Sequence, residues 1–142
     1  MDQNNISSPS NLNGKKILVV DDEPDILTYL TVLMENNGYK TYQAQNAVEA
    51  LKTIQETKPD LISLDIMMPK KSGIAFYREL KLNHETSTTP VIFISAFSMA
   101  RDFTGPGFRK LIPELDIPEP DGYLEKPVDI PRLLELINKI LG

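Results

Sequence analysis

The sequence predicts a doubly wound α/β fold, in which a parallel sheet of five strands is covered on both faces by about five helices. Short, continuous apolar runs alternate along the chain with segments whose apolar residues recur at helical spacing. This pattern is typical of strands that are buried on both faces and joined by crossover helices. Polar side chains stand directly after four of the apolar runs. Because the carboxyl ends of parallel strands line one crevice, we expect these side chains to lie together.

The first third of the chain contains two predicted strands and one helix. The apolar run 17–20 forms the first strand, and 39–44 forms the second. Pro24 suits the first turn of a helix over about 24–36, where its missing N–H has no intrahelical partner. Asn37-Gly38 is a helix stop. The apolar face of this helix comprises Ile26, Leu27, Leu30, Leu33 and Met34.

The middle of the chain repeats the alternation. Asn46 is suited to cap a second helix, and Lys58-Pro59 ends it, because the residue before a proline is disfavoured in helical conformation. The third strand is predicted at 60–64. Ser72-Gly73 then opens a third helix that runs to about Asn83. Its predicted core residues are Ile74, Phe76, Tyr77, Leu80 and Leu82.

The last third of the chain contains a fourth strand at 91–94 and a minimal fifth strand at 123–124. A final helix follows 129–131, because apolar residues recur with a period of 3.6 up to Leu141. Between these strands, 96–122 is predicted to be an irregular, extended segment that is longer than a simple connection. The expectation is a helix that begins over Ser98–Phe103, is broken at Gly105-Pro106-Gly107 and resumes over Phe108–Leu111.

Composition excludes several classes of function. The chain has 142 residues and a net charge of −5, so a nucleic-acid-binding surface has little electrostatic support. It has no cysteine, and His84 is its single histidine, so thiolate metal sites and two-histidine zinc sites are excluded. No apolar stretch is long enough for a membrane span, and no export signal is present at the N-terminus. We therefore expect a cytoplasmic protein without direct nucleic-acid binding or membrane insertion.

Residues 1–13 differ in composition from the rest of the chain. They are dominated by Asn and Ser and contain few large apolar side chains, so they are expected to form a flexible N-terminal tail. One globular domain is expected over 14–142. No second domain is expected in this chain, so it either signals by binding a partner or is one domain of a longer regulator.

The side chains at the predicted strand ends suit magnesium and phosphoryl chemistry. Asp21-Asp22-Glu23 follows the first strand and Asp65 ends the third. Acidic groups that converge repel one another, and carboxylate oxygens are preferred ligands of Mg²⁺, so Asp22 and Asp65 are candidate ligands of this ion. An ionised carboxylate can attack phosphorus, while a lysine such as Lys126 neutralises charge on the phosphoryl oxygens.

These residues resemble those of one known family. Four motifs stand at successive strand ends in the order found in receiver domains of two-component response regulators. They are Asp21-Asp22, the run Asp65-Ile66-Met67-Met68-Pro69, Ser95-Ala96 and Lys126-Pro127. The resemblance covers about 15–141. Each motif alone is common, but the four together are specific. The family implies a flavodoxin-like fold similar to that of chemotaxis regulators.

The resemblance also implies a role for each residue. Asp65 would accept a phosphoryl group from a sensor histidine kinase or a phosphotransfer protein, and the domain would then control a downstream partner. The implied Mg²⁺ ligands are Asp22, Asp65, the Met67 backbone carbonyl and, often through water, Asp21. Lys126 and Ser95 would contact the phosphoryl group, Tyr123 would be the aromatic switch, and the peptide bond before Pro127 would be cis. Glu23 has no implied role beyond favouring a helix N-terminus.

Two other functions use similar residues. Phosphatases and phosphotransferases of the haloacid-dehalogenase type also use a strand-end aspartate and magnesium. Their chemistry requires a second aspartate two residues later, where this chain has Met67. A pseudo-receiver would bind partners without phosphorylation. The complete set of Asp22, Asp65, Ser95 and Lys126 argues against it, because a degenerate site need not keep metal and phosphate groups together.

Two apolar residues near the predicted site are expected to affect the lifetime of the acyl phosphate. Met67 and Phe97 stand two residues beyond Asp65 and Ser95, at positions that flank the path of the hydrolytic water in receivers. Neither side chain can orient water by hydrogen bonding or act as a general base. The sequence therefore predicts slow self-dephosphorylation.

Overall fold

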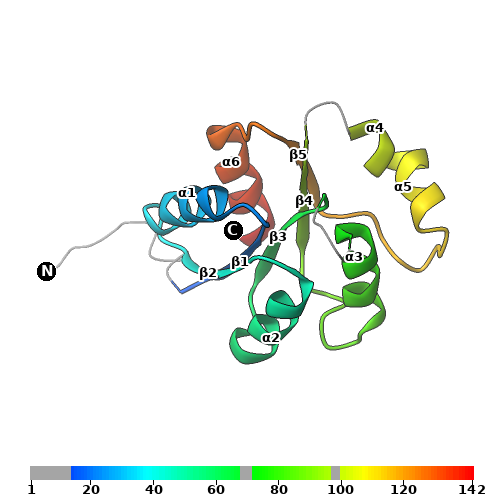
Figure 1. Ribbon diagram of the computed structural model, residues 1–142, viewed down its shortest axis with the longest axis horizontal. Coiled ribbons are helices and arrows are strands. Elements are labelled where there is room, and N and C mark those ends of the chain that lie inside the picture. The colour runs from blue at the N-terminus through cyan, green and yellow to red at the C-terminus, as the bar shows by residue number, and fades with distance from the viewer. Residues whose placement is uncertain (1–13, 68–71, 97–99) are drawn as a thin grey trace, which may run out of the picture.

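A computed structural model shows a single parallel sheet with helices on both sides and describes residues 14–67, 72–96 and 100–142 (Figure 1). Within these residues the sheet has five strands in the order β2-β1-β3-β4-β5. The strands are β1 (Lys16–Val20), β2 (Lys40–Ala44), β3 (Leu61–Asp65), β4 (Val91–Ser95) and β5 (Gly122–Glu125). The helices are α1 (Pro24–Glu35), α2 (Ala47–Thr57), α3 (Gly73–Leu82), α4 (Ala100–Phe103), α5 (Gly105–Leu111) and α6 (Ile130–Leu141). The predicted fold class is confirmed.

The central strands are buried on both faces, as their continuous apolar sequences predicted. All five residues of β3 and all five of β4 are buried. The parallel register pairs Val20 with Leu64 and Asp65 with Ile94, so β1, β3 and β4 end at nearly the same level. This register brings the polar residues at their carboxyl ends to one edge of the sheet.

Two apolar cores flank the sheet. The core under α1 and α6 contains Leu27, Leu30, Met34, Leu133 and Ile137, and the core under α2, α3 and α5 contains Ala50, Ile54, Phe76, Tyr77 and Phe108. Figure 1 shows these two groups of helices on opposite sides of the sheet. One predicted core residue is wrong: Leu82, the last residue of α3, is 55% exposed. It lies two positions beyond the buried Leu80, which places it on a different side of the helix.

The helix caps read from the sequence form local hydrogen bonds. The Asn46 side chain accepts from the backbone N–H of Glu49 at 2.9 Å, and Ser72 accepts from that of Ala75 at 3.1 Å. Pro24 occupies the first turn of α1. Lys58 ends α2 in the left-handed conformation, with φ of 50°. Asn46 and Ser72 each satisfy an N–H that lacks an intrahelical partner, and Pro24 has no N–H to satisfy, which explains why these helix starts were predictable.

The segment between β4 and β5 differs in detail from the prediction. Gly105-Pro106-Gly107 does not end a helix but forms the first turn of α5, where Pro106 lacks only an N–H that needs no intrahelical partner. The preceding α4 is a single turn, and Phe97 and Ser98 lie outside the described residues. The strand β5 extends one residue beyond the predicted 123–124 at each end.

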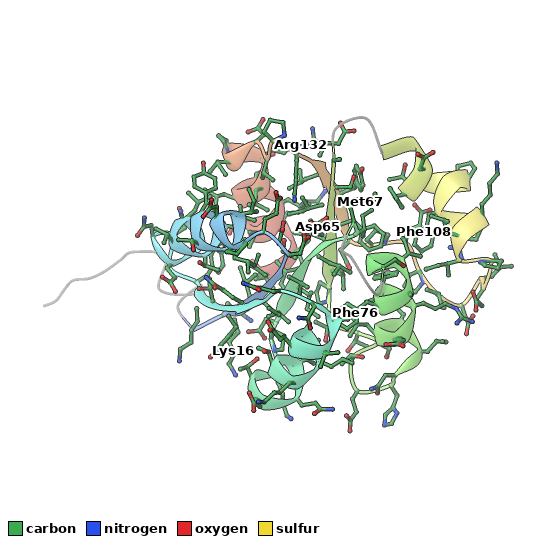
Figure 2. The ribbon with its side chains drawn as sticks, in the orientation of Figure 1. Lys16, Asp65, Met67, Phe76, Phe108 and Arg132 are labelled. Atoms are coloured by element: carbon green, nitrogen blue, oxygen red, sulfur yellow. The ribbon has the colours of Figure 1, made fainter. Side chains whose placement is uncertain are left out.

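The chain after α5 is irregular but firmly attached to the helices. The Tyr77 hydroxyl of α3 donates to the backbone oxygen of Pro118 at 2.7 Å. Arg109 donates to the backbone oxygens of Glu114 and Ile117 at 2.6 and 3.1 Å. Phe108 is fully buried beside the rings of Tyr77 and Phe93, and Figure 2 shows it between α5 and α3. These contacts fix the segment that the sequence predicted to be irregular and extended.

Among the described residues, no helix has both the length and the apolar character needed to cross a bilayer.

Candidate functional site

The polar residues predicted at the strand ends surround one point at the carboxyl edge of the sheet. Asp21 follows β1, Asp65 ends β3, and Lys126 follows β5. The Lys126 ammonium nitrogen lies 3.0 Å from Asp21 Oδ2 and 3.2 Å from Asp65 Oδ2. The peptide bond between Lys126 and Pro127 is cis, as the resemblance implied. Parallel strand ends thus bring together groups that are far apart in the sequence.

Asp65 is held by one contact on each carboxylate oxygen. Its Oδ1 accepts from the Met67 backbone N–H at 3.0 Å, while its Oδ2 accepts from Lys126. Its side chain is only 4% exposed. Figure 2 shows Asp65 and Met67 near the end of β3. The carboxylate is therefore oriented and partly neutralised, which suits a nucleophile more than a surface charge.

The backbone beyond Asp65 is fixed by two further elements. Ile66 donates to the backbone oxygen of Ile94 at 3.0 Å and accepts from the Gly73 N–H at 3.1 Å. Gly73 comes so close that a Cβ there would lie 2.3 Å from Ile66 Cα. Only glycine permits this approach, so the start of α3 is seated directly against the residue that follows Asp65.

Burial changes the protonation equilibria of the site. Burial raises the pKa of Asp21 to about 6, and the negative charge of Asp65 adds to the rise. Hydrogen bonds from the Glu23 backbone and from Lys126 lower the pKa but do not cancel this effect. Burial alone would lower the pKa of Lys126, but hydrogen bonds to Asp21 and Glu23 and the charges of Asp65 and Asp21 outweigh it, so the net shift is upward. Lys126 is therefore a permanent cation, whereas Asp21 takes up a proton in mildly acidic solution.

Three carboxylates of the site are arranged to share a cation. One oxygen from each of Asp21, Asp22 and Asp65 can be chosen so that all three lie within 4.8 Å of one another. An all-oxygen set of this kind fits a hard divalent ion such as Mg²⁺, which prefers carboxylate and water ligands. The residues present therefore fit the ion that the resemblance implied.

Ser95 and Tyr123 form a contact of their own beside the carboxylates. Their hydroxyl groups share a hydrogen bond, and the Ser95 hydroxyl also lies 3.3 Å from the Ala96 backbone oxygen. Ser95 is connected to Lys126 through the backbone, since the Lys126 backbone N–H donates to the Ser95 backbone oxygen at 2.7 Å. Burial raises the pKa of Tyr123, so its hydroxyl stays protonated at neutral pH.

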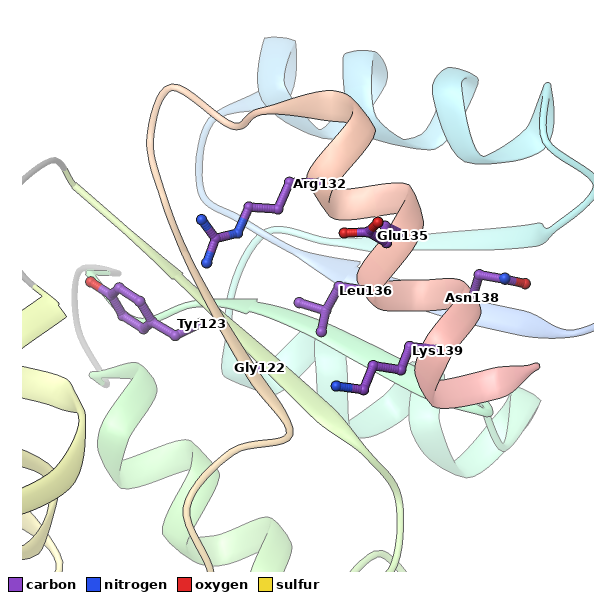
Figure 3. Close-up of a pocket in the computed structure, with 7 residues that line it drawn as sticks. All are labelled: Gly122, Tyr123, Arg132, Glu135, Leu136, Asn138 and Lys139. Atoms are coloured by element: carbon purple, nitrogen blue, oxygen red, sulfur yellow. The ribbon is translucent and has the colours of Figure 1, made fainter.

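Tyr123 is also part of the surface beside β5. It lines a cavity of about 660 Å³ between β5 and α6, towards which Arg132 and Leu136 extend (Figure 3). Gly122 lies so close to α6 that a Cβ there would be 2.5 Å from Leu136 Cδ2. Tyr123 therefore belongs both to the contact with Ser95 and to the lining of this cavity.

Comparison with known protein families agrees with the site geometry. Residues 17–138 match the family described as the response regulator receiver domain. The chain belongs to this family. Four of its strand-end motifs had suggested the same family from the sequence alone.

Two relatives match this receiver domain over almost their whole length. It is 33% identical over 128 residues to the polar-differentiation response regulator DivK of Brucella anthropi, covering 90% of this chain and 97% of that protein. It is 33% identical over 127 residues to protein PilH of Pseudomonas aeruginosa, covering 89% of this chain and 98% of that protein.

Solved structures place the receiver domain in the same fold. The receiver domain of Francisella response regulator 1452 superimposes with a TM-score of 0.75 at 30% identity, covering 90% of this chain and 97% of that one. Chemotaxis protein CheY4 of Vibrio cholerae gives a TM-score of 0.74 at 24% identity, covering 89% and 98% respectively, which supports the fold alone.

Sequence reasoning missed two parts of this receiver domain's site. It gave Glu23 only a helix-terminal role, yet the Glu23 carboxylate lies 3.0 Å from the Lys126 ammonium. It identified Gly73 as a helix start but not as the residue that contacts Ile66. Neither contact leaves a local signal, because each depends on how distant elements are placed in the fold.

Proposed function

We propose that this receiver domain accepts a phosphoryl group on Asp65 from a sensor histidine kinase or a phosphotransfer protein. The observation that carries the proposal is the placement of Asp65, whose two oxygens are held by the Met67 N–H and by Lys126 beside two further carboxylates. A nearly buried aspartate with a cation and a potential metal site beside it suits phosphoryl transfer.

In the proposed reaction an Asp65 oxygen attacks the phosphorus of the donor. A phosphorus–oxygen bond forms as the bond between phosphorus and the donor atom breaks, and the electron pair of that bond leaves with the donor. Lys126 would neutralise charge on the phosphoryl oxygens. Asp21, Asp22, Asp65 and the Met67 carbonyl would hold Mg²⁺, which supplies additional charge neutralisation when bound.

The proposal includes a switch that connects the phosphoryl group to the outer surface. The Ser95 hydroxyl, which shares a hydrogen bond with Tyr123, would exchange this partner for a phosphoryl oxygen. The freed Tyr123 ring would change its position beside β5 and α6, and the changed surface would bias binding of a downstream protein. The proposed setting is the cytoplasm, and residues 14–142 are proposed to form the whole receiver domain.

The test is phosphorylation by a small acyl phosphate in the presence of Mg²⁺, followed by intact mass. The wild-type protein should gain one phosphoryl group, and Asp65→Asn should gain none. Asp25→Asn is the matched control, because Asp25 is an exposed carboxylate in the first turn of α1 and should not affect labelling. Full labelling of Asp65→Asn would refute the assignment. No labelling of the wild type would instead favour the phosphorylation-independent interaction module.

A further inference from the structure

The proposed function gives no role to Glu23, although its side chain is part of the site. Its backbone is fixed, because its N–H donates to Asp21 Oδ1 at 2.9 Å and its backbone oxygen accepts from Ile26 and Leu27 at the start of α1. The side chain does not cap this helix. It extends instead to Lys126, which is 103 positions away in the sequence.

Glu23 occupies one of three carboxylate positions around a single ammonium group. Lys126 Nζ lies 3.0 Å from Asp21 Oδ2, 3.0 Å from Glu23 Oε1 and 3.2 Å from Asp65 Oδ2. The ammonium donates hydrogen bonds to Glu23 and Asp65 and forms an ion pair with Asp21, so each of its three partners is a carboxylate. A phosphoryl oxygen on Asp65 that accepts a hydrogen bond from Lys126 competes with these partners.

The three partners differ in how readily they can be replaced. The side chains of Asp21 and Asp65 are 3% and 4% exposed, whereas that of Glu23 is 59% exposed. A buried carboxylate that loses its hydrogen-bond donor is left with its full desolvation penalty. An exposed carboxylate is rehydrated by water and loses little. Glu23 is therefore the partner that Lys126 gives up first.

We propose that Glu23 is a positioning residue, whose carboxylate holds Lys126 until a phosphoryl oxygen on Asp65 replaces it. The proposal rests on the phosphoacceptor function proposed above. In the unphosphorylated protein the contact with Glu23 favours the resting position of Lys126. The contact therefore weakens phosphoryl binding by the free energy of one exposed ion pair. This lowers the equilibrium constant for phosphoryl binding about two- to fivefold.

The first experiment measures the affinity for trifluoroberyllate, a phosphoryl mimic, at saturating Mg²⁺ by amide chemical shifts. Glu23→Gln removes the charge and should bind the mimic about two- to fivefold more tightly than the wild type. Glu23→Asp keeps the charge but is shorter by one carbon–carbon bond of roughly 1.5 Å. It should resemble Glu23→Gln, because its carboxylate falls short of Lys126. Asp25→Asn removes an exposed charge from the same helical turn and should bind as the wild type does.

The second experiment observes Lys126 directly in the protein without mimic or Mg²⁺. The hydrogen exchange rate and ¹⁵N chemical shift of the Lys126 ammonium group report whether a carboxylate holds it. Glu23→Gln and Glu23→Asp should both exchange faster than the wild type, and Asp25→Asn should not. The signal is assigned by its absence from Lys126→Arg.

The outcomes separate this proposal from its alternatives. Unchanged affinity of Glu23→Gln for the mimic would overturn the proposal. An equal gain in affinity in Asp25→Asn would also overturn it, because a general effect of removing negative charge would then explain the result. Unchanged ammonium exchange in both Glu23 variants would show that Glu23 does not hold Lys126. Failure of the wild type to bind trifluoroberyllate would refute the phosphoacceptor function and the exchange step with it. The ammonium measurement would still show whether Glu23 holds Lys126.

Discussion

The Lys126 ammonium and the Asp65 carboxylate meet at 3.2 Å although 61 positions separate them in the sequence. Asp65 uses Oδ2 for this contact and Oδ1 for the Met67 N–H, so rotation of the carboxylate would break both. The proposed nucleophile is thus held in one orientation before any phosphoryl donor binds. Pre-positioning of this kind lowers the entropic part of a reaction barrier.

The raised pKa of Asp21 predicts that this residue destabilises the protein at neutral pH when no divalent ion is bound. Its pKa in the folded protein is about 6, against a value near 3.8 when unperturbed. A carboxyl group whose pKa is raised by folding stabilises the protein below about pH 4, and this stabilisation is lost as pH rises to about 6. Asp21→Asn should therefore be more stable than the wild type at pH 7, by about 1–2 kcal/mol.

Chemical denaturation in a chelator at several pH values tests this prediction. The free energy of unfolding of the wild type, minus that of Asp21→Asn, should fall between about pH 4 and pH 6 and level off above. The difference between the two proteins is the useful quantity, because other carboxylates titrate in the same range. A difference that stays constant over this range would contradict the prediction.

The carboxylate cluster predicts that Mg²⁺ affinity depends on Asp22. Asp21, Asp22 and Asp65 can place three oxygens within 4.8 Å of one another. Two or three carboxylates with water make an incomplete cage, so binding should be weak, and loss of one ligand should weaken it at least about tenfold. Titration of Asp22→Ala with Mg²⁺, followed by amide shifts, checks this. Asp25→Ala should match the wild type, and equal affinity of Asp22→Ala would rule the site out.

The close approach of Gly73 to Ile66 predicts that Gly73→Ala is strongly destabilising. The new Cβ would lie 2.3 Å from Ile66 Cα, and neither backbone can move without disturbing α3 or the end of β3. We expect a loss of about 3 kcal/mol or more in the free energy of unfolding. Movement at Ile66 should also weaken Mg²⁺ binding, because Ile66 directly follows Asp65.

Gly122→Ala is the matched control for this substitution. Its Cβ would also meet an atom at 2.5 Å, but that atom is the flexible end of the Leu136 side chain. Rotation of Leu136 relieves this overlap, so the loss should be smaller, about 1–2 kcal/mol. Equal losses in the two variants would show that the contact with the Ile66 backbone has no special importance.

The last prediction concerns the lifetime of the acyl phosphate. Met67 is 50% exposed beside Asp65, and its side chain cannot orient an attacking water by hydrogen bonding. Met67→Asn should therefore speed self-dephosphorylation several-fold, while Met67→Leu should leave it unchanged. The decay of phosphorylated protein measures both rates. Phe97→Glu extends the test to Phe97, which lies outside the described residues, and unchanged decay in both polar variants would disprove apolar shielding.

The secondary structure and the family were predictable because their signals are local. Buried parallel strands require continuous apolar residues, as in 91–94, and helix ends require particular capping groups, as at Asn46 and Ser72. Because every parallel strand ends at the same edge, the order of elements was sufficient to bring Asp21, Asp65 and Lys126 together.

Only the tertiary structure decided how those groups contact one another. The sequence contained no sign that Glu23 would contact Lys126, that Gly73 would lie against Ile66, or that α5 would begin at Gly105. The first two contacts depend on the distances between separate elements. The third depends on the core, because burial of Phe108 against Tyr77 and Phe93 stabilises a helix that its glycines and proline alone would disfavour.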